Sequence, residues 1–238
     1  MDKEGLILNS RFALPPNSLG YCGNNSAPAK FKACITQGEC KGVDGELKKF
    51  IVLHPYLKTI AKISSINIFS RKVAECYWFG NELASRAKAS DYKILMDNFE
   101  KQGVPKYYVL ELRKRKPANF IPTHLFQVLF IGAYGGSSLS QKEKIKWVNN
   151  CMIRWGKVVR KNKNTLRLNL CVLRTSRGVF KFTQNQETIQ FNPGFLSNLK
   201  TGDTIAVHWN YAVMTIDENQ TKNIILWSEK VLEFINRG

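Results

Sequence analysis

The chain has 238 residues, of which 44% are hydrophobic, enough apolar material for one large or two small globular domains. It carries 36 Lys and Arg against 18 Asp and Glu, a net charge of +18 that suits an acidic partner such as nucleic acid, an anionic membrane or an acidic protein. The 150 residues before Cys151 hold 23 basic and 12 acidic residues, and the rest hold 13 and 6. This even spread is more typical of a solvated surface than of a docking arm.

Neither an export signal nor a membrane span is indicated by the sequence. Residues 1–5 lack a basic segment followed by an apolar run. The longest apolar stretch, residues 125–134, is shorter than the roughly 20 residues that cross a bilayer. We therefore expect a cytoplasmic protein with no membrane partner, in which the six cysteines are reduced thiols: Cys22, Cys34, Cys40, Cys76, Cys151 and Cys171.

Helical periodicity dominates the first 149 residues. The first forty, rich in Pro, Gly and Asn, predict an ordered region of loops and turns. Apolar residues over 45–63 follow a helical period that Pro55 should kink or split. Further helices are predicted at 73–84 and at 91–102, the latter ended by Gly103. A short helix at 140–149 is expected to connect this half of the chain to the second half.

A change of pattern marks the second part of the chain, residues 150–238. Residues 165–172 alternate with period two, so that Leu166, Leu168, Leu170 and Val172 share one face of a strand. Four further short strands are predicted at 152–160, 179–183, 187–191 and 204–216. Asp217 is a plausible N-cap for a final amphipathic helix. The predicted fold class is α+β: a mostly helical domain (1–149), then a small β-barrel with a C-terminal helix (150–238).

Two residues in the second domain are the leading candidates for chemistry. In the strand around His208, the apolar residues Ile205, Val207 and Trp209 share one face and His208 points to the other. That phase makes the imidazole available, although a locally hydrogen-bonded histidine would show the same pattern. Cys151 lies where the bridging helix meets the first strand.

The sequence around both residues resembles a known family. The first block is a cysteine followed by mostly apolar residues, a glycine, a basic residue and a valine: Cys151-Met152-Ile153-Arg154-Trp155-Gly156-Lys157-Val158. The second is a Gly-Asp pair, a strand containing a histidine, an alanine and an entry to the last helix: Gly202-Asp203, His208, Ala212 and Ile216-Asp217-Glu218. Together they resemble the HypC/HybG/HupF hydrogenase-maturation chaperones. Residues 14–23 and 78–83 resemble an uncharacterised prokaryotic family.

The resemblance implies an OB-like barrel whose role is to carry a metal. It does not imply an enzyme. In that family a cysteine thiolate holds the iron of an Fe(CN)2CO precursor, assembled with HypD and passed to the large subunit of a [NiFe] hydrogenase. By their positions in the two matching sequence blocks, Cys151 and His208 are the metal ligands that the resemblance implies for this chain. A soft thiolate suits low-spin iron, and Arg154, Lys157 or His208 could favour its deprotonation.

Alternatives remain open at this point. A basic protein with a small barrel can bind nucleic acid, although Phe180-Lys181-Phe182 is the one hint of stacking aromatics. A cysteine-dependent enzyme would use Cys151 and His208.

A zinc ion could be bound in the first half of the chain by Cys22, Cys34, Cys40 and His54, though without a Cys-x2-Cys spacing. His124 is a further candidate, more typical of a capping or packing residue, while Cys76 and Cys171 are expected in the core.

Overall fold

The chain forms two compact units in a computed structural model that describes residues 2–132 and 140–237. The first unit is Met1–Thr123 and the second is His124–Gly238. The boundary predicted between residues 149 and 150 therefore falls inside the second unit. It is displaced because the helices before residue 150 pack within that unit, on strand β2 (Thr165–Ser176) and on the C-terminal helix α10 (Glu218–Arg237).

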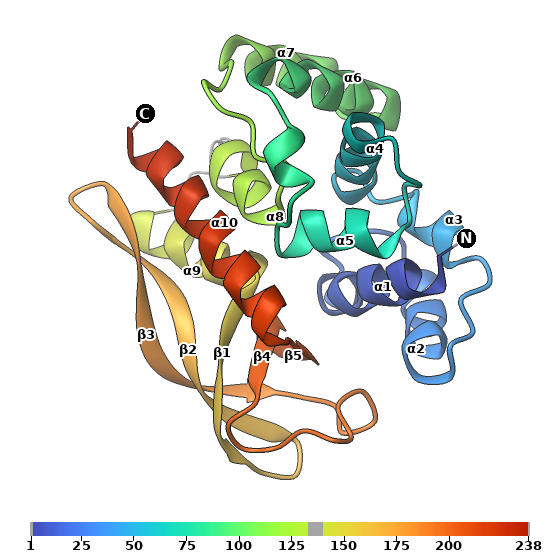
Figure 1. Ribbon diagram of the computed structural model, residues 1–238, viewed down its shortest axis with the longest axis vertical. Helices are drawn as coiled ribbons and strands as arrows, with labels where there is room; N and C mark the ends of the chain where they lie inside the picture. The colour runs from blue at the N-terminus through green and yellow to red at the C-terminus, as the bar shows by residue number, and fades with distance from the viewer. Residues whose placement is uncertain (1, 133–139, 238) are drawn as a thin grey trace. The chain divides into compact units, whose positions relative to one another are not determined.

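The first unit is built from helices (Figure 1). The helices and two 3-10 turns are α1 (Lys3–Ser18), α2 (Ala27–Gln37), α3 (Val43–Leu47), α4 (Leu53–Ser64), α5 (Arg71–Trp78), η1 (Ala84–Arg86), η2 (Ala89–Asp91), α6 (Tyr92–Gln102) and α7 (Lys106–Lys114). Helix α1 packs on α2 and α5, α4 packs on α5 and α6, and α6 packs on α7.

The prediction of loops over the first forty residues is wrong, because α1 and α2 occupy most of this segment. Asp2 caps α1 by accepting hydrogen bonds from the amides of Glu4 and Gly5. The buried face of α1 includes Phe12, whose ring stacks on Trp78 at 4.9 Å between centroids. This burial outweighs the cost of two prolines in the last turn.

Two predicted helix breaks can be compared with the structure. The helical pattern over 45–63 is split as predicted, but before Pro55 and not at it: α3 ends at Leu47 and α4 begins at Leu53, so Pro55 lies in the first turn of α4, where its missing N–H costs little. Gly103 ends α6 in the left-handed conformation, with φ 93°. A glycine adopts that conformation without the Cβ clash of other residues.

The second unit combines one five-stranded sheet with helices. Its strands are β1 (Arg154–Lys161), β2 (Thr165–Ser176), β3 (Val179–Gln190), β4 (Thr204–His208) and β5 (Tyr211–Thr215). The strand order is β1-β2-β3-β5-β4, and β4 pairs with β1, so the order returns to its start. A single parallel pair, Gln190 with Tyr211, joins β3 to β5. The predicted α+β class is confirmed.

The number of strands agrees with the prediction, but their limits differ. Residues predicted as two strands, 179–183 and 187–191, form the single long strand β3, paired along β2 from Thr165 to Ser176. The predicted strand 204–216 is instead the β4–β5 hairpin. The tight turn at Trp209 and Asn210 contains no glycine or proline, so the sequence did not signal it.

Helices cover the second unit at both ends of its sequence. They are α8 (His124–Phe126), continued by the π-helical segment η3 (Gln127–Ile131), α9 (Gln141–Cys151) and α10 (Glu218–Arg237). Ser140 caps α9, and Asp217 caps α10 through its contact with the amide of Gln220. Figure 1 shows α10 crossing one face of the sheet. Within the described residues, no helix is both long enough and apolar enough to traverse a bilayer.

The core of the sheet confirms the period-two pattern of β2. Leu166, Leu168 and Leu170 are fully buried and Val172 is 3% exposed. They pack with apolar residues of the other strands and of the β3–β4 connection: Val158, Ile189, Phe191, Leu196, Leu199, Ile205, Val207 and Ala212.

One pair of cysteines departs from the expected reduced state. Cys34, in α2, forms a disulfide with Cys40 just beyond the end of the same helix, with the two Cα atoms 4.4 Å apart. The prediction of six reduced thiols is therefore wrong for these two residues. The remaining thiols are Cys22, Cys76, Cys151 and Cys171.

The disulfide predicts the outcome of a thiol titration. Protein denatured without reductant should show four reactive thiols, and reduction should raise this number to the six of the sequence. Six thiols before reduction would contradict the Cys34–Cys40 bond.

Gly156 lies where neighbouring strands leave no room for a side chain. It pairs with Leu170 of β2 and with Ile205 of β4, and a Cβ atom there would lie 2.1 Å from the carbonyl oxygen of Asn169. We expect Gly156→Ala to lower the free energy of unfolding by about 3 kcal/mol in denaturant titrations, because the neighbouring backbone must shift. Gly45→Ala, where a Cβ meets nothing within 4 Å, is the control and should not destabilise. Equal stability of the two variants would refute this packing.

Candidate metal centre

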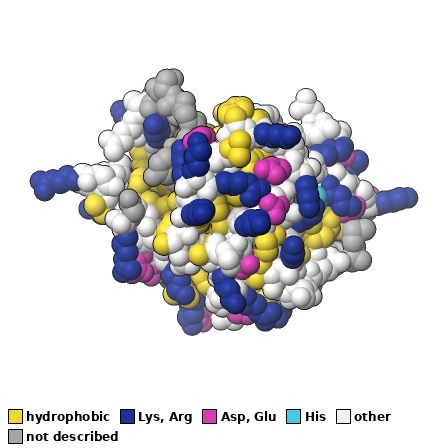
Figure 2. Space-filling model, turned by 90° about the horizontal axis from the view of Figure 1, so that it is seen from above, with side chains coloured by type: hydrophobic (Ala, Val, Ile, Leu, Met, Phe, Trp, Pro, Cys, Tyr) yellow, Lys and Arg dark blue, Asp and Glu magenta, His cyan; other side chains and the backbone are white. Residues whose placement is uncertain are grey.

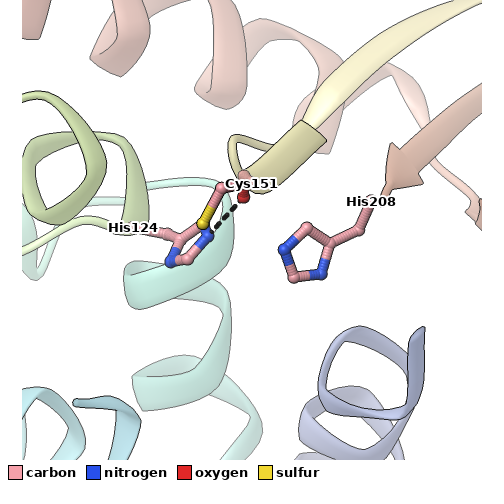
Figure 3. Close-up of side chains that lie close together, drawn as sticks. All are labelled: His124, Cys151 and His208. Atoms are coloured by element: carbon pink, nitrogen blue, oxygen red, sulfur yellow. Dashed lines mark hydrogen bonds between the residues drawn. The ribbon is translucent and has the colours of Figure 1, made fainter. Parts of the chain in front are cut away.

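Three side chains from separate segments of the second unit converge on one point. Cys151 is the last residue of α9, His208 the last of β4, and His124 the first of α8. One ligand atom from each, a ring nitrogen or the sulfur, lies within 4.8 Å of the other two. Figure 3 shows the His208 ring directed toward the adjoining side chains of His124 and Cys151. The two predicted metal ligands, Cys151 and His208, are thus brought together.

Hydrogen bonds from consecutive residues fix the end of α9. The side-chain amide of Asn149 exchanges two hydrogen bonds with the backbone of Leu173 in β2, at 2.8 and 2.9 Å. The carbonyl of Asn150 accepts from the amide of Trp209, at 2.8 Å. The carbonyl of Cys151 accepts from Nε2 of His124, at 2.7 Å. The backbone carrying the thiol is thereby tied to the elements carrying both imidazoles.

The turn after His208 is held in an unusual conformation. Trp209 and Asn210 have φ values of 50° and 58°, in the left-handed region that a bulky residue such as Trp rarely occupies. The buried Arg154 guanidinium bonds Asn210 Oδ1 at 2.5 Å and Glu187 at 2.7 Å. These contacts, with the Trp209–Asn150 bond, hold the turn against the start of β1.

The two imidazoles are buried, whereas the thiol residue is partly exposed. His208 is 2% exposed and His124 is 7% exposed. His208 does leave the apolar face of its strand, but the opposite face is covered too, and its ring lies 5.3 Å from that of His124. Burial lowers the pKa of His124 to about 4, so this ring is neutral at pH 7. Because Nε2 donates to a carbonyl, the neutral ring keeps its lone pair on Nδ1.

This donor set fits a borderline or soft metal ion. A thiolate and two neutral imidazoles suit zinc, iron, copper or nickel rather than magnesium or calcium. Around a tetrahedral metal such ligand atoms are about 3.5 Å apart. Since the three atoms here lie within 4.8 Å, a contraction of at most about 1.3 Å closes them on an ion.

Other predicted contributors lie elsewhere. Arg154 is engaged with Glu187 and Asn210, and Lys157 lines a groove on the sheet. The alternative zinc site is contradicted, because Cys34 and Cys40 form a disulfide and His54 bonds Gln102 at 2.8 Å. Cys76 and Cys171 are buried as expected, and burial raises their thiol pKa values, that of Cys171 to about 12.

His124 belongs to the site, although the sequence pattern indicated it less strongly than Cys151 and His208. It lies 27 residues before Cys151, in a helical segment without a motif, and capping was the more typical role. The capping contact does exist, but its acceptor is the carbonyl of Cys151 itself. Among the described residues, no second group of three such ligands is found.

Comparisons with known proteins identify the family without assigning a function. A model of a family of unknown function (DUF6390) matches residues 1–238, and the chain belongs to this family. No curated protein and no solved structure matches the chain significantly. An uncharacterised family is thus shown, while the resemblance of residues 151–238 to hydrogenase-maturation chaperones stays a prediction.

The buried His124 predicts an acid-sensitive stability. Between pH 6.5 and about 4 the unfolded chain binds a proton at this residue and the folded protein does not, so stability falls as the pH falls through this window. We expect a loss of about 3 kcal/mol from this residue. In His124→Gln, whose amide can still donate to Cys151, that part of the loss should vanish in denaturant titrations. Identical pH profiles for both proteins would contradict the burial.

Proposed function

We propose that the protein is a metal carrier of the hydrogenase-maturation type, with Cys151, His208 and His124 holding the cargo. The observation that carries the proposal is the convergence of one thiol and two imidazoles within 4.8 Å, from three segments of one unit. It serves as a binding protein and not as a turnover enzyme.

The arrangement of exposure suits a cargo that must be handed over. The two imidazoles are buried, while Cys151 is partly exposed, so Cys151 is the ligand residue that a recipient can approach from solvent. Three protein donors leave coordination positions open for other ligands. For an Fe(CN)2CO precursor, two cyanides and one carbon monoxide would complete six-coordinate iron. A recipient could then replace protein ligands one at a time.

The scaffold supports the same interpretation. We take the sheet of the second unit as a small OB-like barrel, closed by the single β3–β5 pair and covered by α10. The resemblance of residues 151–238 supplies the proposed partners, a HypD-like maturation protein and a [NiFe] hydrogenase large subunit. The proposal assigns no role to the first unit.

A cysteine-dependent enzyme is the rival with the same residues. Such enzymes pair the thiolate with a protonated histidine. The pKa of His124, near 4, disfavours the protonated form of this imidazole at pH 7, so His124 is not the cationic partner that such an enzyme needs. A neutral ring is what metal ligation requires.

The proposal predicts metal binding that depends on the three ligands. Anaerobic titration with Co²⁺ should give sulfur-to-cobalt charge-transfer absorption and a stoichiometry of one. Cys151→Ser should abolish this absorption, and His208→Asn should weaken affinity at least about tenfold through the loss of one ligand. Cys22→Ser, which removes an exposed thiol of the first unit, is the matched control and should change nothing. Unchanged absorption in Cys151→Ser would reject the site.

A second experiment tests the cargo. The protein is produced anaerobically together with hydrogenase-maturation proteins and examined by infrared spectroscopy. CN and CO stretching bands that Cys151→Ala erases would support the iron precursor. Cobalt binding without these bands would keep the metal site and reject the precursor as its cargo.

A further inference from the structure

Positive charge is concentrated on one part of the second unit. On the face in Figure 2, Lys and Arg side chains are scattered among acidic ones. Residues 154–190, which form β1, β2 and β3, instead contain nine Lys and Arg and a single acidic residue, Glu187. That carboxylate pairs with the buried Arg154. The other eight side chains, here called the basic ribbon, are Lys157, Arg160, Lys161, Lys163, Arg167, Arg174, Arg177 and Lys181.

Within the described residues, no member of the basic ribbon makes an ion pair with an acidic side chain. Elsewhere such pairs are common: in the first unit, Lys30 pairs with Glu46 and Arg113 with Asp97. The charge of the basic ribbon is therefore uncompensated by the protein itself.

Two pairs of like charges face each other across the strands. Arg160 of β1 is the register partner of Arg167 of β2, and Arg174 of β2 is the partner of Lys181 of β3. All four side chains are exposed. Like charges directly opposite each other destabilise a sheet, and an anion bound between them removes that repulsion.

A groove adjoins the first of these pairs. It has a volume of about 450 Å³, and amide and hydroxyl side chains share its lining with Lys157 and with the apolar Trp155 and Gly156: Asn169, Gln184, Asn185, Gln186, Thr204 and Thr221. Arg167 donates from Nε to Oε1 of Gln186 at 3.1 Å, which links the cationic pair to the groove wall. Amides offer both donors and acceptors, as hydrogen bonding to the edge of a nucleobase requires.

We propose that the basic ribbon binds single-stranded nucleic acid, with phosphates on Arg160, Arg167 and Lys157 and a base in the adjoining groove. The inference goes beyond the proposed metal site and does not depend on it. Cations beside a groove that offers both hydrogen-bonding and apolar contacts complement a chain that alternates phosphates with bases.

The placement of the two pairs favours a flexible strand over a duplex. Side chains alternate between faces along a strand, so Arg167 and Arg174 point to opposite faces of β2. Seven residues of extended chain separate them by about 23 Å. A single strand can follow this twisted surface, whereas a duplex, stiff over about 50 nm, contacts one face at a time.

The proposal is tested by fluorescence anisotropy of the full chain with labelled single strands. The strands have about 20 nucleotides, a length greater than one small barrel covers. Three ligands of the same sequence are compared: single-stranded DNA, single-stranded RNA and the duplex. The variant Arg160→Glu/Lys181→Glu should bind single strands at least about tenfold more weakly, with a slope of log affinity against log salt smaller by about 1.4. The matched control, Lys93→Glu/Lys106→Glu, makes the same change in net charge at the starts of α6 and α7, where acidic residues are favourable. It should bind nearly as wild type does.

The design separates binding from folding. Each ribbon substitution turns a like-charge pair into an opposite-charge pair, so the melting temperature should be equal to or above that of wild type while affinity falls. Single-strand binding that is lost in the ribbon variant and kept in the control supports the proposal. Equal weakening in the control, unchanged affinity in the ribbon variant, equal or tighter duplex binding, or no binding by wild type would each overturn it.

Discussion

The hydrogen bonds of three consecutive residues at the end of α9 hold the second unit's candidate site together. Asn149 is bonded to β2, Asn150 to the turn after His208, and Cys151 to His124. Because the three contacts lead to three different elements, the backbone that carries the thiol cannot move far without breaking bonds to the segments that carry its proposed co-ligands. The site is preorganised by backbone contacts, and metal binding then requires side-chain adjustment more than folding.

The three proposed ligands differ in burial and therefore have different roles in the proposed carrier. Both imidazoles are buried, and burial keeps His124 neutral near pH 7, so it stays competent to ligate. The partly exposed Cys151 is the donor that a recipient can reach. The uncompensated cations of the basic ribbon lie in β1 to β3 and their turns, whereas the three ligands lie at the ends of α9, α8 and β4. The two proposed sites can therefore be altered separately.

Local patterns in the sequence predicted much of the fold but less of the site. The alternation in β2, the cap at Asp217 and the helix end at Gly103 each depend on neighbouring residues, and each was correct. The predictions failed where contacts between residues far apart in the sequence determine the local structure. The burial of α1 overrides the effect of two prolines, and the Trp209–Asn210 turn is held by Arg154 and Asn150. His124 was underrated for the same reason, since no short-range signal shows that a residue 27 positions away is its neighbour.

X-ray absorption spectroscopy of the metal-loaded protein tests the central claim most directly. With zinc as the probe, the account predicts one sulfur at about 2.3 Å and two imidazole nitrogens at about 2.0 to 2.1 Å, with the remaining position filled by an oxygen from solvent. In Cys151→Ser the sulfur shell should disappear, and in His124→Gln one imidazole should be lost. Two or more sulfurs in the wild type, or a coordination shell of oxygens alone, would contradict a centre built from Cys151, His208 and His124.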